Sequence, residues 1–159
     1  MELYFLRHGP AGSMSDWQGP DVERPLTDAG RRVVSAVADG LGRMDVDVDV
    51  ILTSPYTRAM QTAEIVAERL GVSDRLHTDE RLMAGFGLTE LQRVLRDHGD
   101  IAGLMLVGHE PDFSTLVGEL TGGSSVHMKK AAVARVDVED AEAAGGVLQW
   151  LIPPAAFKR

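Results

Sequence analysis

The sequence predicts an α/β fold, a three-layer α/β/α sandwich with a mostly parallel central sheet and an edge β-hairpin at the C-terminus. Short apolar runs alternate along most of the chain with longer amphipathic segments, a pattern typical of parallel strands that helices cover on both faces. The last two strand-like runs follow one another directly and are joined by the acidic, glycine-bearing segment "EDAEAAGG", which is typical of a hairpin.

In the first half of the chain, the pattern predicts two strands, each followed by a helix. Residues 2–6 form an apolar run that predicts a buried strand, and residues 10–25 form a loop rich in Gly, Pro and Asp. Thr27 is expected to cap a helix whose apolar stripe comprises Val33, Val34, Val37 and Leu41. The run "DVDVILTS" predicts the second strand, and Ser54 and Pro55 are expected to begin a helix that Gly71 ends.

In the second half, the pattern predicts a short strand, two helices, a buried strand and the hairpin. The expected elements are a short strand near Leu76–Thr78, a helix from Thr89 to His98, a third buried strand in "GLMLVGHE", a helix opened by Pro111 that runs to Leu120, and hairpin strands over Ala131–Val138 and Val147–Ile152. Folds of this class bind ligands beyond the carboxyl ends of their parallel strands.

The composition is that of an ordinary globular chain, and we expect one domain over residues 1–159. The 159 residues are 44% hydrophobic and 25% charged, with a formal net charge of −8. This charge argues against a nucleic-acid partner, which usually meets a basic face. No apolar run approaches the roughly 20 residues of a membrane helix, and no secretory signal is recognisable, so we expect a cytoplasmic protein away from membranes. The chain has no cysteine, which excludes a thiolate nucleophile.

Chemistry-bearing residues follow three of the predicted parallel strands. The first strand ends in "RHG", the second in "TSPYTR" and the third in "VGHEP", so that Arg7, His8, Arg58 and His109 are expected at one edge of the sheet. Arginine forks bind phosphoryl oxygens in a bidentate manner, and Arg58 lies in the first turn of a helix, where backbone N–H groups also favour an anion. Two cations and two histidines at this edge predict a dianion site.

The nucleophile of such a site must come from a residue other than cysteine. A histidine imidazole can accept a phosphoryl group and then lose it to water, which divides one difficult displacement into two. His8 is the candidate, because Gly9 permits a tight turn and a close approach of the backbone. Asp45, Asp47 and Asp49 alternate at the start of the second strand but lack the glycine and the closing glutamate of a calcium loop, so we expect no metal ion.

Together these stretches resemble the histidine phosphatase superfamily, the phosphoglycerate-mutase-like group, and within it the small phosphohistidine phosphatases of the SixA type. The matching stretches are "LYFLRHGPA", "ERPLTDAGRR", "ILTSPYTRAMQTAEIV", "LMLVGHEPDFSTLV" and "GGVLQWLIPP". The resemblance implies that His8 is the phosphorylated nucleophile and that Arg7, Arg58 and His109 form the phosphate pocket, with His109 able to assist proton transfer. It also implies that the enzyme needs no cofactor.

The chain departs from the superfamily's pattern at the proton donor. Many members carry a glutamate after the second helix, whereas "DERLMAGFG" has Ala84 at that place, with Asp79 and Glu80 nearby as candidate donors. An imidazole leaving group can be protonated near neutral pH, whereas an alkoxide needs a donor far more. The departure therefore favours a phosphohistidine-bearing partner, such as a phosphotransfer protein of a signalling relay, over sugar phosphates.

Two other functions stay open at this point. One is a broad small-molecule phosphomonoesterase that uses the same site, and the other is a phosphate- or phosphoprotein-binding module without turnover. Trp17, in the loop after His8, either walls the pocket, contacts a partner or only packs. The cluster of His127, Lys129 and Lys130 is either a solvated loop or a surface that attracts a phosphoprotein. Nothing in the sequence requires more than a monomer.

Overall fold

The computed structural model describes residues 1–140, 142 and 145–157. Its strands form one sheet in the order β3-β2-β4-β1-β5-β6. The strands are β1 (Glu2–Arg7), β2 (Val50–Thr53), β3 (Leu76–Thr78), β4 (Gly103–Gly108), β5 (Val133–Val138) and β6 (Gly146–Ile152). Strands β1 to β4 run parallel, whereas β5 runs antiparallel to β1 and β6 antiparallel to β5. This topology confirms the mostly parallel sheet with a hairpin at one edge.

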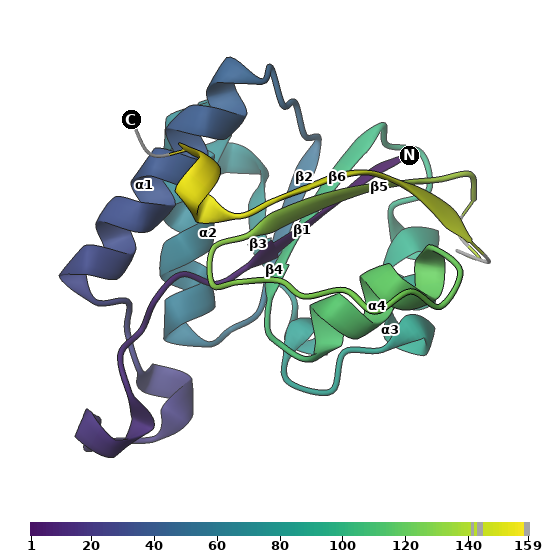
Figure 1. Cartoon of the computed structure of the whole chain (residues 1–159). Helices are drawn as coiled ribbons and strands as arrows, with labels where there is room; N and C mark the ends of the chain where they lie inside the picture. Colours follow the sequence, from purple (N-terminus) through teal and green to yellow (C-terminus); the bar gives the residue numbers. More distant parts are fainter. Residues whose placement is uncertain (141, 143–144, 158–159) are drawn as a thin grey trace.

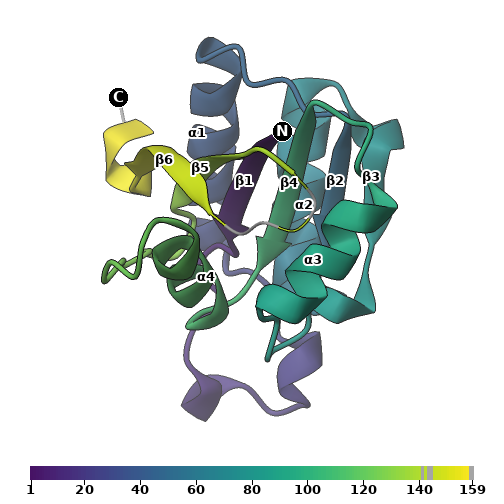
Figure 2. The same cartoon turned by 90° about the vertical axis from the view of Figure 1, so that its right-hand side faces the viewer.

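Helices cover both faces of this sheet, as Figures 1 and 2 show. The helices are α1 (Asp28–Arg43), α2 (Thr57–Leu70), α3 (Leu88–Asp97) and α4 (Asp112–Leu120). Side chains alternate along β1, so that Leu3 and Phe5 pack with α3 and α4, whereas Tyr4 and Leu6 pack with α1 and α2. The predicted three-layer sandwich is therefore confirmed.

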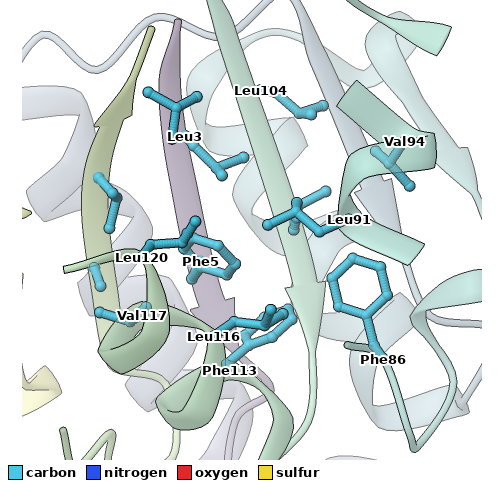
Figure 3. Close-up of a cluster of buried hydrophobic side chains, with 14 of the residues drawn as sticks. Leu3, Phe5, Phe86, Leu91, Val94, Leu104, Phe113, Leu116, Val117 and Leu120 are labelled. Atoms are coloured by element: carbon cyan, nitrogen blue, oxygen red, sulfur yellow. The ribbon is translucent and has the colours of Figure 1, made fainter. Parts of the chain in front are cut away.

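The buried face beneath α3 and α4 is shown in Figure 3. Phe5 meets Phe113 of α4 edge to face, with 5.2 Å between ring centroids and an interplanar angle of 77°, a favourable geometry for two aromatic rings. Every residue of β4 is buried. A strand covered on both faces is apolar without alternation, which explains why the run "GLMLVG" could be recognised as buried from its sequence.

The predicted helix ends are confirmed at two positions and need correction at a third. Thr27 caps α1, since its Oγ1 accepts the Gly30 N–H at 2.9 Å. Gly71 ends α2 in the left-handed conformation, with φ of 72°. Pro55, however, does not occupy the first position of α2, because Tyr56 keeps an extended backbone with ψ of 132° and the helix begins at Thr57.

The second predicted strand and the first strand of the hairpin are shorter than expected, whereas the second hairpin strand begins one residue earlier, at Gly146. Strand β2 begins at Val50 because Asp49 turns its carboxylate to the start of β4, where it accepts the Ala102 N–H at 2.8 Å and the Gly103 N–H at 2.9 Å. Strand β5 begins at Val133 because the preceding residues form a tight turn. In the acidic segment "EDAEAAGG", residues 141, 143 and 144 lie outside the described residues. None of the described helices is long and apolar enough to cross a membrane.

Candidate active site

The sheet brings the three predicted strand ends together. Strands β1 and β4 are in register with Arg7 beside Gly108, and the His8 N–H donates to the Gly108 carbonyl at 3.0 Å. The His8 and His109 rings consequently lie with their centroids 5.3 Å apart. On the other side of β4, the Ser54 N–H donates to the Val107 carbonyl at 3.0 Å, which places the start of α2 beside His109.

His8 is buried and neutral, with one ring nitrogen held and the other directed into the site. Its Nδ1 lies 2.7 Å from the Gly9 carbonyl oxygen, and a carbonyl only accepts, so Nδ1 carries the proton and Nε2 the lone pair. Burial, together with the nearby positive charge of Arg58, lowers the pKa of His8 to about 3. The imidazole is therefore uncharged at neutral pH, with a lone pair on Nε2.

Arg58 points its guanidinium at that nitrogen. Its Nε donates to His8 Nε2 at 3.3 Å, and its side chain is buried. Asp21 holds the far side of the guanidinium: Nη2 donates to Oδ2 at 3.0 Å, and Nη1 donates to the Asp21 carbonyl at 2.8 Å. The Tyr56 ring centroid lies 4.9 Å from Arg58 Cζ, a cation–π contact. Arg58 is thus fixed beside His8 by its neighbours.

Asp21 is itself shared between two arginines. Arg24 donates to Asp21 Oδ1 through Nε at 3.0 Å. Although desolvation raises the pKa of Asp21, hydrogen bonds from Arg24 and Arg58 outweigh it and lower that pKa. Asp21 belongs to a short 3₁₀ turn, Asp21–Glu23, within the loop that the sequence predicted as irregular.

His109 shares its ring nitrogens between Ser54 and the interior of the site. Its Nε2 lies 2.8 Å from Ser54 Oγ, and its ring centroid lies 4.6 Å from that of Tyr56. Burial lowers its pKa to about 4, and the positive charge of Arg58 acts in the same direction. His109 is therefore neutral at pH 7, like His8.

Two buried polar atoms at this edge of the sheet have no partner among the described residues. They are Nε of Arg7 and Nδ1 of His109. Buried polar groups in folded proteins are nearly always hydrogen-bonded, so these two unpartnered atoms at neighbouring strand ends indicate a place for a polar ligand. Arg7 is otherwise held by the Met128 carbonyl, which accepts from Nη1 at 2.8 Å, and burial lowers the pKa of its guanidinium.

The two candidate proton donors lie outside this group of contacts. Asp79 accepts from Arg81 through both carboxylate oxygens, the shortest at 2.6 Å from Nη2. That hydrogen bond, the largest influence, lowers the pKa of Asp79, so this carboxyl is a poor acid. Glu80 is exposed. Within the described chain, no hydrogen bond joins either side chain to the four predicted site residues, and their role as donors stays a prediction.

Three residues that hold the site together were not predicted from the sequence. Asp21 orients Arg58 and Ser54 orients His109. Thr62 Oγ1 accepts the Gly9 N–H at 3.0 Å and donates to the Arg58 carbonyl at 2.7 Å, which ties the turn after His8 to α2. The spacing of Asp21 and Arg24 was a usable signal for a short ion-paired turn, whereas Ser54 before a proline resembles a plain helix cap.

Comparisons with known proteins identify the family to which the chain belongs. A family model described as the histidine phosphatase superfamily (branch 1) matches residues 3–92. An uncharacterised protein of Picosynechococcus sp. is 37% identical over 139 residues, which cover 84% of this chain and 82% of that protein. Phosphohistidine phosphatase SixA of Escherichia coli is 27% identical over 161 residues, covering 99% of this chain and 97% of SixA.

Among solved structures, the protein histidine phosphatase SixA complexed with tungstate matches with a TM-score of 0.88 and 27% identity. The match covers 99% of this chain and 100% of that one. Similarity of sequence and fold over the whole chain supports phosphatase activity, the hydrolytic removal of a phosphoryl group. The chain belongs to the histidine phosphatase superfamily.

Proposed function

We propose that the protein is a phosphohistidine phosphatase that forms a phosphohistidine on its own His8, without a metal ion. The observation that carries the proposal is the state of His8, a buried neutral imidazole with its proton fixed at Nδ1 and its lone pair at Nε2 beside Arg58. A neutral imidazole held in one tautomer is ready to attack phosphorus. The similarity to phosphohistidine phosphatase SixA supports the same substrate class.

In the first step, His8 Nε2 forms a bond to phosphorus while the bond between phosphorus and the substrate's imidazole nitrogen breaks. A phosphorylated imidazole whose second nitrogen is protonated leaves as a neutral imidazole, so this leaving group needs no proton from the enzyme. An alkoxide would need one. The proposal thus accounts for Ala84 at the place of the family's usual glutamate and for Asp79 being held by Arg81.

Three donors stabilise the transferred group. Arg58 Nε donates to His8 Nε2 in the free protein and becomes available to a phosphoryl oxygen once Nε2 bonds phosphorus; Arg7 Nε has no partner among the described residues. The third is His109 Nδ1. Ser54 Oγ accepts the Tyr56 N–H at 3.3 Å and lies 2.8 Å from His109 Nε2, and we assign the hydroxyl proton to this second contact, which leaves the histidine's proton at Nδ1. Charge on the equatorial oxygens is stabilised by such fixed donors.

In the second step, water attacks phosphorus and the bond to His8 Nε2 breaks. The Nδ1 proton stays hydrogen-bonded to the Gly9 carbonyl throughout, so His8 departs as a neutral imidazole and the site returns to its starting state. Inorganic phosphate is the product. The phosphorus–nitrogen bond of the substrate and that of phosphorylated His8 are therefore cleaved by the same chemistry, with an imidazole as the leaving group each time.

The experiment is to trap the intermediate. The protein is incubated with a radiolabelled phosphohistidine peptide, quenched in base, and tested for a label that survives alkali and is lost in acid. We expect the label on wild type and on His77→Ala, a control at an exposed histidine of β3, and no label on His8→Ala. A chelator should change neither labelling nor turnover. Retention of label on His8→Ala would contradict the proposal, whereas turnover of sugar phosphates faster than the peptide would favour the phosphomonoesterase.

A further inference from the structure

The segment that joins α4 to β5 passes the end of β1 (Figure 1), and it contains two adjacent lysines. Lys129 and Lys130 are two of the three lysines in the chain, and both are exposed. Exposed lysines on an acidic protein are ordinary when they balance nearby carboxylates. Among the described residues, however, neither lysine forms an ion pair.

The turn that carries these lysines is bonded to the strand that carries the nucleophile. The Ala131 N–H donates to the carbonyls of Arg7 at 3.1 Å and His8 at 3.0 Å, and the Arg7 N–H donates to the Ala132 carbonyl at 3.1 Å. The Arg7 side chain adds the hydrogen bond to the Met128 carbonyl. Because the Lys130 Cα is two covalent bonds from the Ala131 nitrogen, the lysine pair lies at the rim of the candidate active site.

The turn is also fixed in its own conformation. The Ala132 N–H donates to the Lys129 carbonyl at 2.8 Å, and Ala131 has a φ of 62°. A residue with a Cβ adopts this left-handed conformation only where its surroundings hold it. The surroundings here include Met128, which is fully buried and whose N–H donates to Ser114 Oγ at 3.3 Å. The backbone that carries the two lysines is therefore held in one conformation.

We propose that Lys129 and Lys130 bind carboxylates that flank the phosphohistidine on an acidic partner protein. This inference rests on the proposed function and specifies its substrate. Arg7, Arg58 and His109 already account for the phosphoryl group, so the exposed pair is available for a second negative charge outside the pocket. The chain has a net charge of −8, yet these two cations at the rim of the site form no ion pair among the described residues. Their positive field therefore attracts an anionic surface to this edge of the sheet.

The test compares phosphohistidine peptides that differ only in their flanking charge. One peptide carries Glu on both sides of the phosphohistidine, a second carries Ser and a third carries Lys. For wild type we expect kcat/KM to be about fivefold higher for the Glu peptide than for the Lys peptide at low salt, as two exposed ion pairs allow. The preference should vanish at about 1 M salt, where the screening length is about 3 Å.

Charge reversal supplies the decisive variant. In Lys129→Glu/Lys130→Glu, the ratio of kcat/KM between Glu and Lys peptides should fall below one, and Lys129→Gln/Lys130→Gln should bring it near one. The ratio is taken within one enzyme, so a general loss of activity cancels. The control Arg43→Glu/Arg93→Glu makes the same change of charge at exposed positions of α1 and α3 and should keep the wild-type ratio.

The outcomes separate this inference from the function on which it rests. Equal ratios in wild type and in the lysine variants overturn the role of the lysine pair while the proposed function stands. A shift of the same size in the arginine control also overturns it, since the effect would then be one of net charge alone. If wild type hydrolyses none of the three peptides, the proposed function itself fails and this inference fails with it.

Discussion

Asp21 offers the sharpest test of how the site is held in position. Its carboxylate accepts from Nη1 of Arg58 at 3.3 Å and from Nη2 at 3.0 Å, while Arg58 Nε lies beside His8. The substitution Asp21→Ala removes both side-chain bonds and keeps the backbone carbonyl that accepts from Nη1. We expect Arg58 to lose its fixed orientation and the transferred phosphoryl group to lose one preorganised donor.

The size of the effect depends on the exposure of the pair. Hydrogen bonds to a charged group contribute about 1.5–3 kcal/mol when they are shielded from water. Arg58 is buried, but the Asp21 side chain is 38% exposed. Water therefore weakens these hydrogen bonds, and their free-energy contribution lies closer to that of a surface ion pair. A loss of about 1–1.5 kcal/mol remains, which corresponds to a fall in kcat/KM of about tenfold.

The assay is a double-mutant cycle with Arg58→Ala, which measures kcat/KM toward a phosphohistidine peptide. If Asp21 acts only through Arg58, Asp21→Ala should cost about tenfold in the wild-type background and almost nothing once Arg58 is gone. Equal losses in both backgrounds would refute the reasoning. A rise in kcat/KM for Asp21→Ala would refute it in the opposite direction, since it would mean that the carboxylate competes with substrate for the guanidinium.

The buried histidines, Ser54 and two glycines of α1 give three more tests. The lowered pKa values of His8 and His109, about 3 and about 4, mean that the unfolded chain binds protons that the folded chain excludes. The free energy of unfolding should therefore fall as pH drops from about 6.5 toward 4, by up to about 1.4 kcal/mol per pH unit for each histidine, and urea titrations of a His8→Asn/His109→Asn variant should show a shallower fall. Ser54→Ala should lower kcat/KM about fivefold, a loss of about 1 kcal/mol for one hydrogen bond, and an unchanged value would contradict the proton assignment at His109. Gly30→Ala should destabilise by about 1–3 kcal/mol in urea unfolding because its Cβ would meet the Pro10 carbonyl oxygen at 2.0 Å, whereas Gly42→Ala, whose nearest neighbour would lie at 3.9 Å, should stabilise by about 0.5–1 kcal/mol.

The parts of the fold that sequence predicts well are those decided by burial. Strands β1 and β4 are buried on both faces, so their apolar runs are continuous, and the residues after each run emerge at the same edge of a parallel sheet. The register of these two strands is enough to place Arg7, His8 and His109 together. No knowledge of side-chain geometry is needed for that placement.

The supports of the site could not be predicted, because irregular backbone decides them. Asp21 reaches Arg58 from a loop whose path depends on a single 3₁₀ turn, and nothing periodic in the sequence encodes that path. Ser54 contacts His109 from a stretch in which Tyr56 stays extended and the helix begins only at Thr57, a local path that the sequence does not indicate. Ala131 holds a left-handed φ that its residue type does not suggest, and strand β5 starts two residues later than expected for that reason.

The proposed function explains both the absence of a glutamate at residue 84 and the neutral state of His8. Transfer from a phosphohistidine substrate to His8 exchanges one bond between phosphorus and an imidazole nitrogen for another of the same kind. Such an exchange is near balance in energy, so the site has to stabilise only the charge on the oxygens in transit, the role that we propose for Arg7, Arg58 and His109. An ester substrate would break this balance, because its alkoxide is a far poorer leaving group than an imidazole. A glutamate at residue 84 would then be needed, and restoring it by Ala84→Glu should raise turnover of an alkyl phosphate more than turnover of the phosphohistidine peptide. An equal rise for both substrates would mean that the leaving group does not decide what this site can hydrolyse.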